Sequence, residues 1–203
     1  MGIKTISANR APGRPRSQKC YQAIMNATIK LLEDTTVRDL TIEAIASEAK
    51  VGKTTIYRWW CCKTALVVDA FLEYMIPRAH FPESDSAIEA LEQQVKQVID
   101  VYNGKIGRIV AEIIAEGQFE PEILASFRER FLSGRRAAAT EVIERGKQNG
   151  EFPDDLDVEL AIDLIYGPIY YRLLVGHIPL NETFANSLLK QAINGLKRSI
   201  ETQ

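Results

Sequence analysis

Apolar residues recur at three- and four-residue spacing along most of the chain, and β-branched residues do not alternate with polar ones over any useful length. This spacing is typical of amphipathic α-helices rather than of strands. We therefore predict an all-α protein. In the first part of the chain the pattern favours helices over residues 17–34, 41–49, 53–60 and 63–77.

Helix-breaking residues divide the chain into an arm, a head and a body. Pro12, Gly13 and Pro15 prevent a helix in the first 16 residues, which we expect to form a flexible basic arm. Pro77 and Pro82 frame the connection between the head, 17–80, and the body, 81–203. In the body, breaks at glycine and proline clusters separate predicted helices at 83–102, 105–116, 122–148, 157–176 and 181–201.

Charge distinguishes the two domains, although the whole chain carries a net charge of −2. Residues 1–80 have a net charge of +5 and residues 81–203 a net charge of −7, so the head is suited to bind a polyanion. The 46% hydrophobic content is ordinary for a globular protein, and no run approaches about 20 apolar residues. Three cysteines, two of them adjacent, favour a reducing compartment. We expect a cytoplasmic protein with no membrane partner.

Residues 41–60 have the pattern of a helix-turn-helix. Ala46 supplies the small residue that two closely crossing helices need, and Ile45, Ile56 and Trp60 fall on the inner faces. The turn calls for a left-handed backbone at Lys50, which costs roughly 1 kcal/mol for a residue other than glycine.

The opposite face of the second helix is predicted to enter the major groove of DNA. Thr54, Thr55 and Arg58 point away from the core, with Lys53 and Tyr57 beside them. Lysine and arginine donate to guanine or phosphate, and threonine contacts thymine methyls or phosphate. Lys63, at the start of the next helix, can reach an adjacent phosphate, and Arg14 and Arg16 of the arm suit the minor groove or the backbone. A solvated tail is the alternative for the arm.

The segment LTIEAIASEAKVGKTTIYRWWCCKTAL, residues 40–66, closely resembles the DNA-binding domain of the TetR family of repressors, and the resemblance extends over about 10–75. It departs from the family pattern at Lys50, Gly52 and Trp59, where glycine, serine and a polar residue are usual. Thr41 caps the first of the two helices and completes the DNA-binding set. The resemblance implies DNA contacts for Lys53, Thr54, Thr55, Tyr57, Trp59 and Lys63.

Two further motifs of the head point to other chemistries. Gly52-Lys53-Thr54 ends like a phosphate-binding loop, but Ser47 stands where that motif needs its first glycine, and no strand precedes it. The pair Cys61-Cys62 is either a plain part of the loop between two helices or a redox switch beside the recognition helix. His80 and His177 are not at metal-ligand spacing, so we expect no metal and no cofactor.

The last two predicted helices of the body are candidates for a dimer interface. Residues 157–175 are apolar on two sides, one with Leu160, Leu164 and Tyr171. The resemblance implies that these helices pair with their copies in a four-helix bundle, whereas the alternative is that they only close the protomer core. The predicted interface consists of Ile162, Ile165, Ile169, Leu173, Phe184, Leu188, Ala192 and Leu196.

The resemblance also implies that a small molecule binds inside the body and releases the dimer from a near-palindromic operator. Aromatic residues with a few polar groups are the candidates for its site, although such residues are usually core. The candidates are Tyr102, Phe119, Phe127, Phe131, Tyr166, Tyr170 and Arg172.

Three functions compete on the sequence alone. The leading prediction is a homodimeric repressor that binds double-stranded operator DNA at the nucleoid and responds to an unidentified small molecule. A DNA-binding regulator without an effector is the first alternative. A small helical enzyme is the second, but no nucleophile, base and orienting residue stand at a recognisable spacing, so we predict no enzymatic activity.

Overall fold

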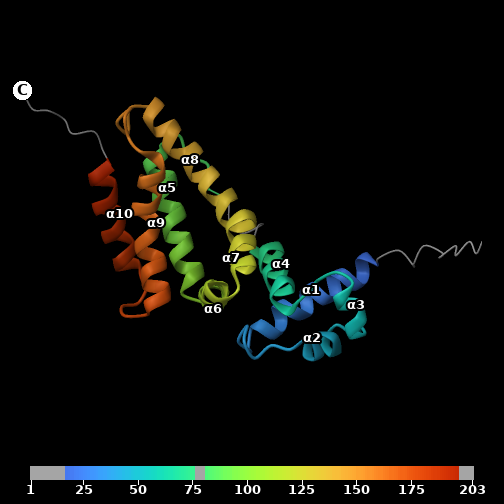
Figure 1. The fold of residues 1–203 in the computed structure, drawn as a ribbon. Helices are drawn as coiled ribbons and strands as arrows, with labels where there is room; N and C mark the ends of the chain where they lie inside the picture. Colours follow the sequence, from blue (N-terminus) through green and yellow to red (C-terminus); the bar gives the residue numbers. More distant parts are fainter. Residues whose placement is uncertain (1–16, 76–80, 197–203) are drawn as a thin grey trace, which may run out of the picture.

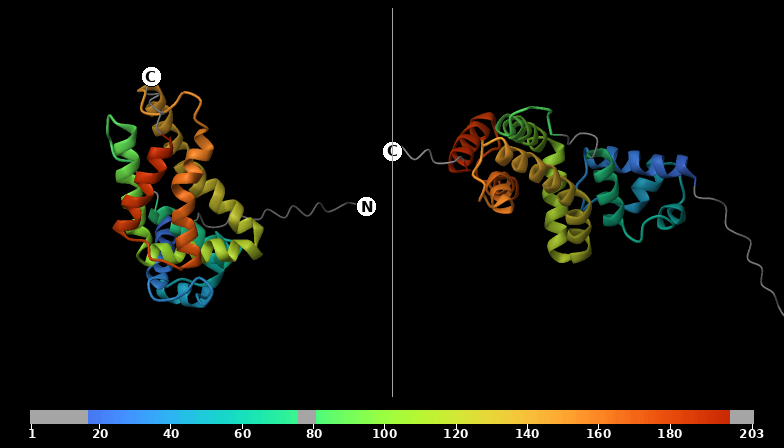
Figure 2. Two further views of the ribbon diagram at one scale, coloured as in Figure 1. Left: turned by 90° about the vertical axis from the view of Figure 1, so that its left-hand side faces the viewer. Right: turned by 90° about the horizontal axis from the view of Figure 1, so that it is seen from above.

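The computed structural model describes residues 17–75 and 81–196, which form helices without any strand. The predicted arm, with Arg14 and Arg16, lies outside the described residues, as does Pro77. Figure 1 shows the head helices at one end of the molecule and the body helices at the other. The view from above in Figure 2 places α4 on the side of the head that faces the body. The predicted all-α fold with a helix-turn-helix head and a helical body is confirmed.

The head consists of α1 (Gln18–Leu32), α2 (Ile42–Glu48), α3 (Lys53–Tyr57) and α4 (Lys63–Met75). Thr41 caps α2, because its Oγ1 accepts a hydrogen bond of 3.1 Å from the amide of Ala44. Lys50 has the predicted left-handed backbone, with φ of 54°, which allows the chain to turn between α2 and α3. The recognition helix α3 is shorter than predicted, because a turn over Arg58 and Trp59 follows Tyr57.

The body consists of α5 (Ala87–Tyr102), α6 (Lys105–Phe119), α7 (Pro121–Phe127), η2 (Arg128–Leu132), α8 (Ser133–Gln148), α9 (Val158–Val175) and α10 (Glu182–Leu196). The single helix predicted over 122–148 contains a π-helical turn, η2, in its middle. Such turns are frequent at functional sites. No helix in the described ranges is both long and apolar enough to cross a membrane.

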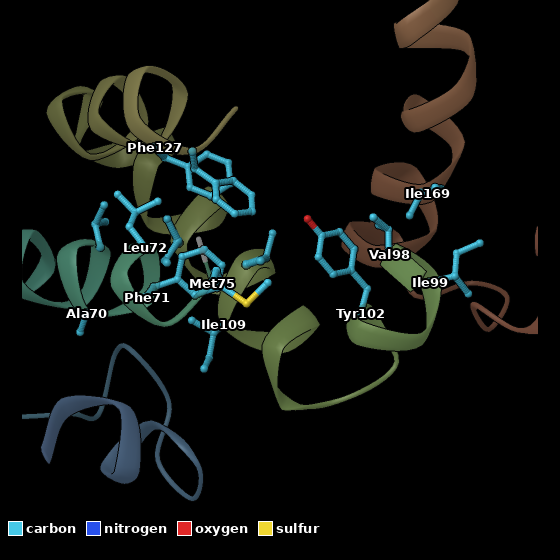
Figure 3. Packing of buried hydrophobic residues seen from close by; sticks show 14 of the residues in the cluster. Ala70, Phe71, Leu72, Met75, Val98, Ile99, Tyr102, Ile109, Phe127 and Ile169 are labelled. Atoms are coloured by element: carbon cyan, nitrogen blue, oxygen red, sulfur yellow. The ribbon is translucent and has the colours of Figure 1, made fainter. Parts of the chain in front are cut away.

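A continuous hydrophobic core runs from the head into the body through α4. Figure 3 shows Phe71, Leu72 and Met75 of α4 gathered with Phe127 of α7 and Ile109 of α6. All five side chains are at most 3% exposed. Because close-packed side chains transmit displacement, any movement of α7 in the body acts directly on α4.

A polar clamp on α6 makes a second link between the domains. Arg108 donates to the carbonyl oxygen of Leu32, the last residue of α1, at 2.6 Å and to that of Thr35 at 3.2 Å. Glu112, one turn later, accepts the amide hydrogen of Val37 at 2.7 Å. These bonds satisfy backbone groups that the end of a helix leaves without partners, and so they hold the α1–α2 loop on the body.

Candidate DNA-binding surface and ligand cavity

The recognition helix α3 has one buried side and one exposed side. Ile56 is fully buried and Trp60, just beyond the helix, is 4% exposed. Thr54 and Arg58 are exposed, Thr55 is half-buried, and the large side chain of Tyr57 is 55% exposed. The opposite side of α3 is anchored in the core, so the exposed ring of Tyr57 is available for contact with another molecule.

Charged side chains lie beside this exposed side of α3. The Lys53 ammonium lies 2.9 Å from a carboxylate oxygen of Glu43 on α2, and both side chains are more than half exposed. The hydrogen bond between them raises the pKa of Lys53 and lowers that of Glu43. Lys63 donates to the carbonyl oxygen of Arg38 at 2.8 Å. The two ammonium groups thus lie at the edge of the exposed side of α3.

The two tryptophans after α3 attach the recognition helix to its neighbours. The half-buried Trp59 ring lies 5.0 Å from the Tyr21 ring of α1, and the Trp60 indole donates to Asp69 of α4 at 2.7 Å. Burial and a hydrogen bond to Glu73 raise the pKa of Tyr21 to about 12. The packing of Trp59 on α1 gives this residue a structural role, in addition to the DNA contact that the resemblance implies.

Cys61 and Cys62 are exposed in the loop that joins α3 to α4. Their sulfur atoms are 3.9 Å apart. The interaction with Cys62 raises the pKa of Cys61, which favours the neutral thiol over the reactive thiolate.

Asp69 connects the recognition helix with the middle of the body. Besides accepting the Trp60 indole hydrogen, its carboxylate pairs with Arg130 of the π-helical turn η2. The next residue of η2, Phe131, packs on Phe71 of α4 with ring centroids 5.2 Å apart. The end of α3, α4 and η2 are thus joined by one ion pair, one hydrogen bond and one aromatic contact.

An apolar cavity of about 190 Å³ lies between α5, α8 and α9. This volume is below the roughly 300–1,000 Å³ of pockets that hold drug-sized ligands, so it suits a compact molecule. Its lining residues are Phe81, Gln94, Val98, Tyr102, Leu132, Arg135, Arg136, Ile162, Asp163, Tyr166, Gly167 and Tyr170.

Three tyrosine hydroxyls and one amide supply most of the neutral polar groups of the cavity. The hydroxyls of Tyr102 and Tyr170 are 3.1 Å apart, and that of Tyr166 donates to the amide oxygen of Gln94 at 2.7 Å. Burial raises the pKa of all three tyrosines, so each remains a neutral hydroxyl at physiological pH. The cavity therefore combines an apolar lining with hydrogen-bonding groups at fixed positions.

A second apolar surface lies on the outer side of α9, which Figure 2 shows next to α10 on one face of the body. Its large side chains recur at helical spacing, and each is about half exposed. They are Leu160 at 54%, Leu164 at 50%, Tyr171 at 60%, Leu174 at 47% and Val175 at 55%. Gly167 lies on the same stripe, and a Cβ added there would meet nothing within 4 Å. We call these six residues the α9 face.

Most of the residues predicted for the dimer interface lie on the other side of α9 or on the buried side of α10. Ile162, Ile165 and Ile169 are at most 2% exposed, and Phe184 and Leu196 of α10 are also buried, so all five pack inside the protomer. Side chains that are already buried within their own protomer cannot bury further surface area against a partner. Leu173, Leu188 and Ala192 are half-buried at the rim of the core.

Comparison with known proteins assigns both parts of the chain. A family described as "Bacterial regulatory proteins, tetR family" matches residues 24–70, and "Tetracyclin repressor-like, C-terminal domain" matches residues 81–192. The chain belongs to the TetR family of bacterial regulators. It is 34% identical over 191 residues to the uncharacterized HTH-type transcriptional regulator YdeS of Bacillus subtilis, and the match spans 94% of this chain and 96% of that protein.

Solved TetR-like structures share the fold over most of the chain. The transcription regulator SCO0332 has a TM-score of 0.76 at 27% identity and covers 89% of this chain and 100% of its own. FadR from Bacillus subtilis in complex with stearoyl-CoA has a TM-score of 0.71 at 23% identity, covering 87% of this chain and 99% of its own. The chain is accordingly a helix-turn-helix transcription regulator of the TetR family.

The TetR-like body brings together only part of the predicted effector set. Tyr102, Tyr166 and Tyr170 line the cavity. The other four residues lie elsewhere. Phe119 is 86% exposed at the end of α6, Phe127 and Phe131 are core residues beneath α4, and Arg172 lies 3.6 Å from the centroid of the Phe184 ring and donates to Pro179.

Sequence reasoning missed Gln94, Arg135 and Arg136 of the cavity wall. For Gln94 a signal existed, because it interrupts the apolar stripe of α5 yet is only 5% exposed. A polar residue at a buried helical position needs a hydrogen-bond partner and so marks a polar site in the interior. Arg135 and Arg136 carried no such signal, since they precede a run of alanines on a polar helix.

Proposed function

We propose that the chain is a homodimeric repressor that binds a near-palindromic operator and leaves it when a small molecule enters the cavity. The main support for this proposal is the exposed side of α3, which carries Thr54, Tyr57 and Arg58. The head with this helix is joined through α4 to a body that contains an apolar cavity. A regulator of this kind acts without catalysis, in the cytoplasm and on the nucleoid.

The DNA contacts proposed for the head keep the predicted set, with roles that follow from its geometry. Thr54, Tyr57 and Arg58 face the major groove, and Lys53 and Lys63 reach phosphates. A phosphate would replace Glu43 as the partner of Lys53, since the pair is exposed and weak. Thr41 is nearby, but its hydroxyl oxygen is already occupied as the cap of α2.

Dimerisation is proposed through the α9 face rather than through the residues predicted from the sequence. A helix of five residues contacts too few base pairs for specific binding, so two heads must reach successive major grooves. The α9 face offers contiguous apolar area, and Gly167 in its middle allows two helices to approach closely. The half-buried residues Leu188 and Ala192 of α10 would complete the contact.

Control by an effector is supported by the contacts between the cavity and α4. Arg135 in the cavity wall lies on the ring of Phe131, which packs on Phe71 of α4. A ligand that displaces Arg135 and the Phe131 ring would shift α4, and the spacing of the two heads in the dimer would change with it. The apolar lining and the small volume favour a compact apolar effector, and the long-chain acyl-CoA of the FadR complex, which is much larger than the cavity, serves as a contrasting probe.

The proposed function is tested by selecting bound sequences from randomised duplex DNA with the full-length protein at two salt concentrations. We expect enrichment of a palindromic site that Tyr57→Ala loses and that Lys190→Ala, at an exposed position of α10, retains, whereas Lys53→Ala should weaken binding to all sequences alike. Each lost phosphate contact lowers the slope of log affinity against log salt by about 0.9. Selection without enrichment, or equal selection by all variants, would contradict sequence-specific recognition through α3.

A further inference from the structure

Two neighbouring arginines of α8 line the cavity, and their electrostatic environments differ. Arg136 is held by two carboxylates of α9, since it pairs with Glu159 and lies 2.6 Å from Asp163. Arg135 forms no ion pair with any residue of the described chain. Its guanidinium lies 4.3 Å from the centroid of the Phe131 ring. The cavity wall thus carries one arginine paired with two carboxylates, a group with a net charge of −1, and one arginine without a carboxylate partner among the described residues.

The charge of Arg135 reaches the hydroxyl groups of the cavity. Although burial raises the pKa of Tyr102, Tyr166 and Tyr170, the Arg135 charge opposes that effect at each of them. All four residues line the same cavity. A half-buried cation without a carboxylate partner attracts an anion more strongly beside an apolar lining than in bulk water.

The tyrosine pair adds a hydrogen-bond donor next to that charge. When two hydroxyls share one hydrogen bond, the accepting hydroxyl still has its own hydrogen to donate. In the pair Tyr102–Tyr170 that hydrogen has no acceptor among the described residues. A carboxylate, with two acceptor oxygens, could take one hydrogen bond from this pair and another from Arg135.

We infer that the cavity binds a compact apolar molecule with a single negative charge, which pairs with Arg135 and accepts a hydrogen bond from the Tyr102–Tyr170 pair. The inference rests on the proposed role of the cavity as the effector site. The volume of about 190 Å³ sets the size of the apolar part. Repulsion from Arg135 disfavours a cation at the same position.

The test compares two probes of equal shape that differ in charge. Calorimetric titration of the full-length protein at neutral pH measures the affinity for 2-naphthoate and for its neutral analogue 2-naphthamide. A charge-assisted pair favours naphthoate by at least about tenfold. Equal binding of the two probes, or no binding of either while stearoyl-CoA binds, overturns the inference.

Variants assign the preference to Arg135. We expect Arg135→Gln to abolish the preference for naphthoate and Arg135→Lys to keep part of it, because lysine retains the charge but not the planar geometry. Arg128→Gln removes the same charge from an exposed position of η2 that does not line the cavity, and should bind both probes as the unmodified protein does. A preference that persists in Arg135→Gln would overturn the assignment. Helical circular dichroism of each variant confirms that it is folded.

Operator binding measured with and without naphthoate separates the two proposals. Selective naphthoate binding that leaves operator affinity unchanged would support the ligand class and contradict effector control. An operator that is bound normally, together with equal binding of both probes, would contradict only the ligand class.

Discussion

The α9 face makes a sharp prediction, because adjacent residues of one helix have opposite surroundings. Leu164 is 50% exposed in the protomer, whereas Ile165 is fully buried. If the face is the dimer interface, Leu164→Arg should dissociate the dimer without unfolding the protomer. Ile165→Ala should instead destabilise the protomer itself.

The expected loss of dimer affinity follows from the apolar area that the protomer leaves exposed and the dimer would bury. Complete burial of a leucine is worth about 1.5–3 kcal/mol, so covering the exposed half of Leu164 in both copies contributes a similar amount to one dimer. The substitution Leu164→Arg loses that gain and adds one charge in each copy, which must be desolvated or displaced from the interface. Together these effects should raise the dissociation constant of the dimer at least about a hundredfold. Ile165→Ala leaves a cavity and should lower the free energy of unfolding by about 2–5 kcal/mol.

Sedimentation equilibrium over a range of concentrations measures the dissociation constant, and circular dichroism with a chemical denaturant measures the free energy of unfolding. Gln93→Arg, which adds the same charge at an exposed position of α5, serves as the control and should leave both quantities unchanged. An unaltered dissociation constant for Leu164→Arg would refute the proposed interface, whatever the effect at Ile165.

Three further changes test the packing and the electrostatics of the protomer. Arg108→Ala removes two hydrogen bonds to the head and should cost about 1.5–3 kcal/mol in denaturant unfolding; a loss within error would show that the clamp contributes nothing. Glu151 accepts three hydrogen bonds at the start of α5. Burial alone would raise the pKa of Glu151, but these hydrogen bonds lower it. The stabilisation from the charged carboxylate is therefore present above pH 4.5 and is lost as the pH falls through the lowered pKa. Unfolding measured against pH should therefore show a steeper acid loss in the unmodified protein than in Glu151→Gln, and equal slopes would contradict this. Gly107→Ala places a Cβ 2.0 Å from the carbonyl oxygen of Tyr102 and should lower the melting temperature, whereas Gly134→Ala, with nothing within 4 Å, should raise it slightly.

The head could be predicted from the sequence almost residue by residue. Ile45, Ile56 and Trp60 are buried where their spacing places them, and Lys50 adopts the left-handed turn. The reason is that a helix-turn-helix is a short-range unit, in which the phase of each helix and one tight turn determine which side chains face inward. The family also followed from this segment, because its motif is continuous in the chain.

The cavity could be predicted only in part, since its wall is assembled from segments far apart in the sequence. Tyr102 and Tyr170 are 68 residues apart, yet their hydroxyls share a hydrogen bond. Phe127 and Phe131 had the same aromatic character as these tyrosines, but they lie beneath α4. Side-chain type sets what a residue can bind, and helix packing decides whether it reaches a cavity or the core.

The residue pattern alone predicts an all-helical chain, the place of the recognition helix and two apolar sides on α9. Helix packing settles which of those sides the protomer buries, where the π-helical turn interrupts the helix predicted over 122–148, and which arginine of α8 has no carboxylate partner. Periodicity gives the angle between two apolar stripes on one helix, but it contains no information on the neighbours that cover them. Burial and ion pairing are properties of those neighbours, and the neighbours are set by the fold.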